Sequence, residues 1–122
     1  FFEPHNMPGK RMNIYGGWDI YGRGIYDVCI DIRGNHGKIE TFFYENGMGV
    51  ANEERFLNEE GQIQDVYRIQ FVKEHLAYVH QPIAVGSDMH GHQLGTFIDC
   101  GSRIRAYNNS YGIVLLEDET AQ

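Results

Sequence analysis

Apolar residues in the first third of the chain recur with the period of a helix. Ile25, Val28, Cys29 and Ile32 are spaced i, i+3, i+4 and i+7, which places all four on one helical face. The segment before them, residues 1–17, is rich in Gly, Pro and Asn and is expected to be irregular. The pattern predicts an amphipathic helix that ends at Gly34.

A second stripe of apolar residues follows Asp65, a residue type that caps helices. Its members are spaced 3, 3, 4 and 3 residues apart and are Val66, Ile69, Val72, Leu76 and Val79. Pro82 and Gly86 mark the exit from this segment. The spacing predicts a second helix whose buried face carries these five side chains.

Two other segments have the composition of β-strands. Residues 38–46 (KIETFFYEN) are β-branched and aromatic and lie between glycines. Residues 90–99 (HGHQLGTFID) form a second candidate strand, which two internal glycines weaken, and residues 111–118 (YGIVLLED) are a short final apolar run. Helices that alternate with strands predict an α/β fold with a parallel sheet.

Length and charge narrow the classes of protein to which the chain can belong. Its 122 residues suit one domain, and a hydrophobic fraction of 42% is ordinary for a folded protein. The formal net charge of −7 argues against a surface for nucleic-acid phosphates or for anionic lipid. No apolar run approaches the ~20 residues of a transmembrane helix. Much of the acid lies in residues 52–65 (NEERFLNEEGQIQD), where we expect a solvated loop.

The cysteines and histidines give little sign of redox or metal chemistry. Cys29 and Cys100 lie far apart among apolar residues, so we expect two buried free thiols in a reducing compartment. His90 and His92 would share one face of a strand, but no third and fourth ligand are spaced to complete a metal site. His75 and His80 are five residues apart on the predicted helix, and we expect both on its surface. We therefore expect no metal and no other cofactor.

Four segments, in order and spacing, resemble glycoside hydrolase family 1. Residues 17–27 (GWDIYGRGIYD) are similar to the family's Gly-Trp-Glu-Ile-Tyr-Pro-x-Gly-Leu-Tyr-Asp stretch, and residues 44–50 (YENGMGV) to its strand-end Glu-Asn-Gly motif. Residues 58–83 resemble the helix after that motif, and residues 92–114 resemble the last barrel strand and the loop beyond it. Within the family the likeness is greatest to bacterial 6-phospho-β-glucosidases, which are cytoplasmic enzymes that process imported phosphorylated disaccharides.

The resemblance implies a fold and a reaction. Residues 1–122 would form a single C-terminal portion of a (β/α)8 TIM barrel, from the sixth barrel helix through the eighth strand. The glutamate of the Glu-Asn-Gly motif is the family's nucleophile, and its position here is Glu45. The family is retaining: the nucleophile attacks the anomeric carbon while a second carboxyl, about 5–5.5 Å away, protonates the leaving group. Without the resemblance, Glu45 would be interpreted as a surface acid at the end of a strand.

The chain departs from the family in length and in its second carboxyl. A complete TIM barrel needs roughly 250 residues. The family's acid/base is the glutamate of an Asn-Glu-Pro segment on the fourth strand, whereas this chain has only Asn-Glu-Glu, at 52–54 and 58–60 in the acidic segment. Because both steps of the reaction use the second carboxyl, we expect the isolated chain to be inactive.

The positions expected to contact the sugar are partly altered. They are Asn46, Ser102, Asn109 and Tyr111. Ser102 and Tyr111 match residues with which 6-phospho members of the family hold the phosphate, but Asn109 and Ser110 stand where those members have cations. Non-phosphorylated relatives carry Glu in place of Ser102, so Ser102 favours the 6-phospho branch. The tryptophans of the family's sugar platform are replaced by Gly95, Gly101 and Arg103.

Two hypotheses follow from these matches and departures. In the first, the chain belongs to a β-glycosidase that acts on β-glucosides or 6-phospho-β-glucosides in the cytoplasm, together with the missing N-terminal barrel part. In the second, it is an inactive barrel fragment that self-associates through uncovered strand edges into a homo-oligomer. Neither hypothesis involves nucleic acid or a membrane.

Overall fold

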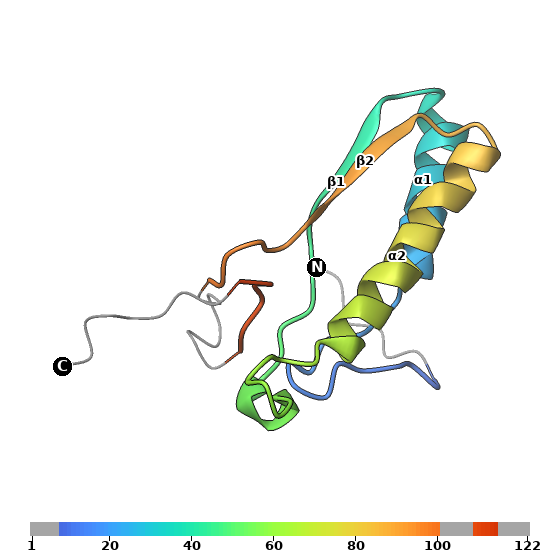
Figure 1. Ribbon diagram of the computed structural model, residues 1–122. Helices are drawn as coiled ribbons and strands as arrows, with labels where there is room; N and C mark the ends of the chain where they lie inside the picture. The colour runs from blue at the N-terminus through green and yellow to red at the C-terminus, as the bar shows by residue number, and fades with distance from the viewer. Residues whose placement is uncertain (1–7, 101–108, 115–122) are drawn as a thin grey trace.

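The computed structural model describes residues 8–100 and 109–114. Its elements follow the order α1 (Arg23–His36), β1 (Thr41–Asn46), a short 3-10 helix η1 (Glu53–Phe56), α2 (Val66–Ala84) and β2 (Met89–Leu94). The predicted order of helix, strand, helix and strand is confirmed. Both helices pack on the same side of the strands (Figure 1).

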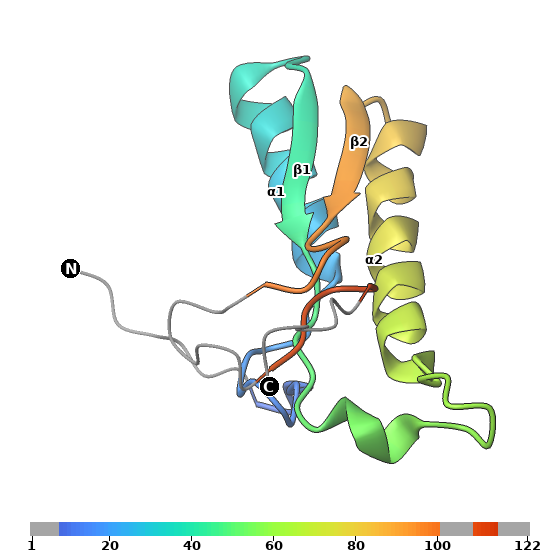
Figure 2. The same ribbon diagram turned by 60° about the vertical axis from the view of Figure 1, so that its left-hand side comes forward.

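The two strands form a parallel pair, as the alternating pattern predicted. Thr41 lies opposite Met89 and Phe43 lies opposite His92. Parallel strands need a long crossover, and α2 with the loop before it makes that connection. Both strands point toward the same end of the molecule, where the loop before α1, η1 and residues 109–114 gather (Figure 2). This end is called the loop end below.

The first helix, α1, buries part of the predicted face and extends beyond its predicted end at Gly34. Ile25 and Cys29 are buried, while Val28 is 48% exposed. Gly34 lies inside the helix, which ends at Gly37 with a φ of 81°. This positive φ favours glycine, and it explains why the later glycine, not Gly34, ends the helix.

The predicted buried stripe of α2 is wrong. Val66, Ile69 and Leu76 are exposed, and only Val79 of the five predicted residues is buried. The buried face instead carries Arg68, Phe71, His75, Val79 and Pro82, which are spaced 3, 4, 4 and 3 residues apart. Two of these side chains are polar, so apolar periodicity alone selected the wrong face.

Asp65 precedes α2 but does not cap it through its side chain. Its carboxylate accepts a hydrogen bond from Arg68 instead. The acidic segment is also less loop-like than expected, because it contains η1 and a bridge between Leu57 and Ile63. The final apolar run contributes only an isolated bridge, Ile98 to Val114, within the described residues.

Two apolar clusters hold the elements together. The first joins both helices to the sheet and contains Ile25, Cys29, Val79 and Met89, with Phe43 and Tyr78 against them. The second lies at the loop end and contains Met48, Val50 and Phe71. Both cysteines are free; Cys29 is buried as expected, but Cys100 is exposed. Within the described residues, no helix is long and apolar enough to cross a membrane.

Candidate active site at the strand ends

Glu45 occupies the next-to-last position of β1, at the end of the strand that faces the loop end. Its side chain is exposed, and its backbone has a φ of 57°. Few residues other than glycine adopt this left-handed conformation. Unusual backbone conformations of this kind concentrate at functional sites, which makes Glu45 a candidate functional residue.

A pocket of about 420 Å³ opens beside Glu45. It is lined by one residue of β1, by the end of β2 and by the segments that follow β2: Glu45, Gln93, Leu94, Gly95, Thr96, Cys100 and Tyr111. The pocket therefore brings a carboxylate and a phenol hydroxyl to one surface from distant parts of the sequence. A carboxylate offers a nucleophile or a base, and a phenol can donate a hydrogen bond.

The two strand ends approach each other closely at this pocket. A Cβ at Gly47 would lie 1.5 Å from the carbonyl oxygen of Gly95, and a Cβ at Gly95 would lie 2.8 Å from the Cα of Glu45. The peptide bond between Gly95 and Thr96 is cis. The close contact explains why both positions are glycine, and the wall beside Glu45 is made of backbone.

Asn46 is held by a histidine of the neighbouring strand. Its Oδ1 lies 2.9 Å from Nε2 of His92. Burial lowers the pKa of His92, and the nearby His75 lowers it further. A neutral His92 donates from Nε2 to the Asn46 oxygen and so fixes the amide next to Glu45.

His75 was expected on the surface and is buried instead, with an exposed fraction of 4%. Its ring stacks on Phe71 with 3.8 Å between the ring centroids, and its Nδ1 lies 2.8 Å from the Phe71 carbonyl oxygen. Burial lowers the pKa of His75 despite that hydrogen bond. The sequence offered a signal, since His75 lies four residues after Phe71 and four before Val79.

Tyr111 is fixed by Asp99, whose importance the sequence did not reveal. One carboxylate oxygen of Asp99 accepts hydrogen bonds from the backbone N–H groups of Tyr111 at 2.7 Å, Cys100 at 3.0 Å and Gly112 at 3.1 Å. Burial raises the pKa of Asp99, but these N–H donors, Gly112 first, outweigh it and leave the pKa below its ordinary value. The charged carboxylate thereby holds the turn that presents Tyr111.

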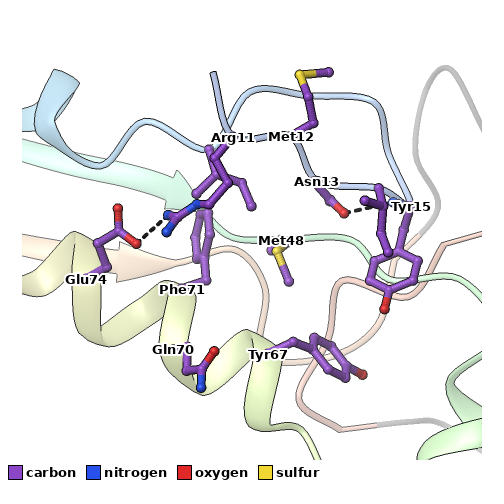
Figure 3. A pocket seen from close by; sticks show the side chains of 11 residues that line it. Arg11, Met12, Asn13, Tyr15, Met48, Tyr67, Gln70, Phe71 and Glu74 are labelled. Carbon is purple, nitrogen blue, oxygen red and sulfur yellow. Dashed lines mark hydrogen bonds and ion pairs between the residues drawn. The ribbon is translucent and has the colours of Figure 1, made fainter. Parts of the chain in front are cut away.

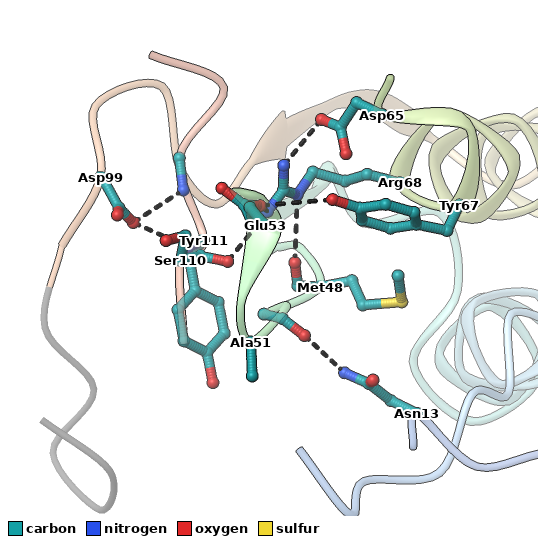
Figure 4. Close-up of polar contacts among 12 residues, drawn as sticks. Asn13, Met48, Ala51, Glu53, Asp65, Tyr67, Arg68, Asp99, Ser110 and Tyr111 are labelled. Carbon is teal, nitrogen blue, oxygen red and sulfur yellow. Dashed lines mark hydrogen bonds and ion pairs between the residues drawn. The ribbon is translucent and has the colours of Figure 1, made fainter. Parts of the chain in front are cut away.

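A buried arginine connects the remaining loops. Arg68 is 3% exposed, and its guanidinium donates to Glu53, to Asp65 and to the carbonyl oxygens of Met48 and Ser110 (Figure 4). Burial lowers the pKa of Arg68, but its two carboxylate partners raise it above the ordinary value. The Arg68 side chain thus connects η1 and the residue before α2 to two further chain segments, one at Met48 and one at Ser110.

A second pocket, of about 290 Å³, lies between α2 and the loop before α1 (Figure 3). Met48 and Phe71 line it, and Arg11 forms an ion pair with Glu74 at its edge. Asn13 accepts a hydrogen bond from the Tyr15 N–H at 3.0 Å and donates one to the Gly49 carbonyl at 2.9 Å. Arg11, Glu74 and Asn13 are thus already engaged with protein groups, and Glu45 lies outside the lining of this pocket.

The two histidines of β2 have separate partners. His90 pairs with Asp88 at 3.0 Å, whereas His92 pairs with Asn46. Among residues 8–100 and 109–114, no three His, Cys, Asp or Glu side chains gather as metal ligands would.

The structure brings two of the predicted sugar-contacting residues together. Tyr111 shares the pocket of Glu45. Tyr111 and Asn46 both line another pocket, of about 550 Å³, to which residues of α1 and β1 also contribute. Asn109 is buried, and its Nδ2 donates to the Tyr15 carbonyl at 3.4 Å. Ser102 lies outside the described residues.

Comparison with known proteins places this geometry in a family. A family model described as "Glycosyl hydrolase family 1" matches residues 5–122. The chain is 52% identical over 114 residues to the 6-phospho-beta-glucosidase GmuD of Bacillus subtilis, and covers 24% of that protein. It is 30% identical over 106 residues to Beta-glucosidase A of Acetivibrio thermocellus, and covers 23% of it. The chain thus spans about a quarter of the length of the curated relatives that it matches.

The fold of the chain is similar to part of a solved structure. A solved family 1 β-glucosidase from Thermotoga maritima superposes with a TM-score of 0.76 at 23% identity, over 96% of this chain and 25% of the other. The predicted fold class, an α/β portion of a TIM barrel too short to close, is confirmed.

Proposed function

Because the chain belongs to glycosyl hydrolase family 1, we propose that it is the C-terminal portion of a retaining β-glycosidase in which Glu45 is the nucleophile. In this proposal α1 is the sixth barrel helix, β1 the seventh strand and β2 the eighth. The observation that carries the proposal is the position of Glu45 at the end of β1, beside a pocket that it shares with Tyr111. TIM-barrel active sites lie at this end of the strands.

The reaction proceeds in two steps at the anomeric carbon. The Glu45 carboxylate attacks that carbon, the glycosidic C–O bond breaks, and the leaving oxygen takes a proton from a second carboxyl. That carboxyl then deprotonates a water, which breaks the glycosyl–Glu45 ester and restores the carboxylate. The second carboxyl comes from the barrel part outside these 122 residues, so catalysis requires both parts.

The substrate class is a β-glucoside or its 6-phosphate. One relative is named a 6-phospho-β-glucosidase and another a β-glucosidase, and the former is the more similar in sequence. We expect Asn46, Ser102, Asn109 and Tyr111 to contribute to sugar recognition and expect no cofactor. A cytoplasmic location belongs to this proposal, because phosphorylated disaccharides are processed there.

A chimera tests the assignment of Glu45. The chain replaces the matching quarter of the Bacillus subtilis relative, which supplies the rest of the barrel. We expect the chimera to hydrolyse a chromogenic 6-phospho-β-glucoside, and Glu45→Gln to lower the rate by about a thousandfold or more. Glu40→Gln, a change of the same kind just before β1, leaves the rate unaltered.

A mechanism-based label gives the second measurement. A 2-deoxy-2-fluoro glycoside should attach covalently to Glu45, which mass spectrometry of peptides identifies. An active chimera labelled at another residue, or fully active as Glu45→Gln, overturns the proposal. The isolated chain should show no hydrolysis above its own Glu45→Gln variant.

A second candidate function is that of a self-associating structural fragment. The observation in its favour is that each described strand pairs on one edge only, while large apolar side chains such as Tyr44 and Phe97 are more than half exposed. Light scattering distinguishes it: a compact monomer at every concentration contradicts self-association.

A further inference from the structure

We propose that Arg68 is a positioning residue that sets Tyr111 against the turn following Glu45. The inference rests on the proposed function in one respect only, namely that the pocket shared by Glu45 and Tyr111 is the reactive one. Arg68 lies on the first turn of α2 and is not among the residues that line that pocket. It acts through the two chain segments that form the pocket wall.

Two of its hydrogen bonds reach those segments. Nε donates to the Met48 carbonyl at 3.2 Å, three residues after Glu45, and Nη2 donates to the Ser110 carbonyl at 2.9 Å, one residue before Tyr111 (Figure 4). One rigid, planar group therefore fixes the spacing between both segments.

The two carboxylate partners hold the guanidinium in one orientation. Nη1 donates to Asp65 at 2.7 Å, and Nη2 also forms an ion pair with Glu53. The side chains of Arg68 and Glu53 are 4% and 11% exposed, so water competes little for these contacts. A lysine could keep the charge but not the fork of donors that serves four acceptors at once.

The segments joined in this way are in direct contact. Val50 and Ser110 exchange backbone hydrogen bonds at 2.9 and 2.8 Å. The Tyr111 ring lies over Gly49, because a Cβ at Gly49 would come within 2.5 Å of the ring. The position of the Tyr111 ring on Gly49 is therefore the quantity that Arg68 controls.

Nuclear magnetic resonance of the 122-residue chain measures this position without substrate. The proposal predicts a nuclear Overhauser effect between the Gly49 α-protons and the Tyr111 ring in the wild-type chain. Arg68→Met should lose this signal while the shifts of α1 and β2 stay those of the folded chain. Arg55→Met serves as the matched control, since Arg55 lies nearby on the surface and donates to the Ala51 carbonyl instead.

Arg68→Lys covers the case in which Arg68→Met does not fold. It keeps a buried cation beside Glu53 and Asp65, and should fold with a weakened signal between Gly49 and Tyr111. A full-strength signal in either folded variant overturns the proposal, and so does collapse of α1 and β2 in both variants, since Arg68 would then serve the whole fold. Because no substrate is present, either result is independent of whether Glu45 is a nucleophile.

Discussion

The helix–sheet body and the loop end are held together by different forces. In the body, Ile25, Cys29, Val79 and Met89 pack both helices against the strands. At the loop end the backbone is irregular, and charged side chains such as Arg68 and Asp99 bind its N–H and carbonyl groups directly. Irregular backbone leaves polar groups without regular partners, so a site built there depends on buried charge for its shape.

The largest change in stability is expected in the apolar cluster of the helix–sheet body. Ile25→Ala should lower the free energy of unfolding by about 2–5 kcal/mol, because it removes buried methyl groups from the body cluster. Ile14→Ala, the same change at a side chain that is 83% exposed, should alter it by less than about 0.5 kcal/mol. Urea denaturation followed by circular dichroism measures both, and equal effects would contradict the assignment of the core.

Two glycine-to-alanine substitutions, one at the loop end and one in the helix–sheet body, should change the stability of the fold in opposite directions. Gly47→Ala should destabilise the fold by about 1–3 kcal/mol, because the new methyl group meets the backbone of Gly95 at the loop end. Gly34→Ala should stabilise it by about 0.5–1 kcal/mol, because it lies within α1 and the added carbon meets nothing within 4 Å. The same denaturation assay tests the signs; stabilisation by Gly47→Ala would show that the strand ends are further apart.

The smallest effect concerns charge at the loop end. The folded-state pKa of Asp99 lies below its ordinary value of 3.8, so its contribution to stability is complete above that value and is lost as the pH falls through the folded-state pKa. Asp99→Asn should therefore destabilise the chain near neutral pH and lessen the loss of stability on acidification. Urea midpoints at about pH 7 and about pH 3 measure this difference, with Asp31→Asn on α1 as the control. An unchanged slope in Asp99→Asn would exclude a stabilising role for the charge.

The body could be predicted from the sequence more fully than the loop end. Helical and strand periods are local, so the order of elements and the parallel sheet followed from them. The buried face of α2 did not, because its apolar residues form two possible stripes and the correct one includes Arg68 and His75. Those side chains are buried only because Glu53, Ser110 and Phe71 satisfy them, and no local pattern reports partners so distant in sequence.

The candidate site, too, was predicted from the sequence only where a local pattern defines it. Glu45 at a strand end was predicted from a short motif, and the structure places it there. Glu45 and Tyr111 lie 66 residues apart in the sequence, and their proximity depends on the crossover between the strands and on the hydrogen bonds of Asp99 and Arg68. Asp65 and Glu53 were interpreted as a cap and a solvated acid because their actual partner, Arg68, has no sequence signature.

The left-handed backbone at Glu45 has a consequence for laboratory evolution. An L-residue in this conformation gives up roughly 1–2 kcal/mol relative to glycine, so folding alone favours glycine at position 45. Selection of variants for heat resistance would enrich that glycine and discard the carboxylate. Recovery of glycine from such a library would show that the side chain at position 45 lowers the stability of the fold.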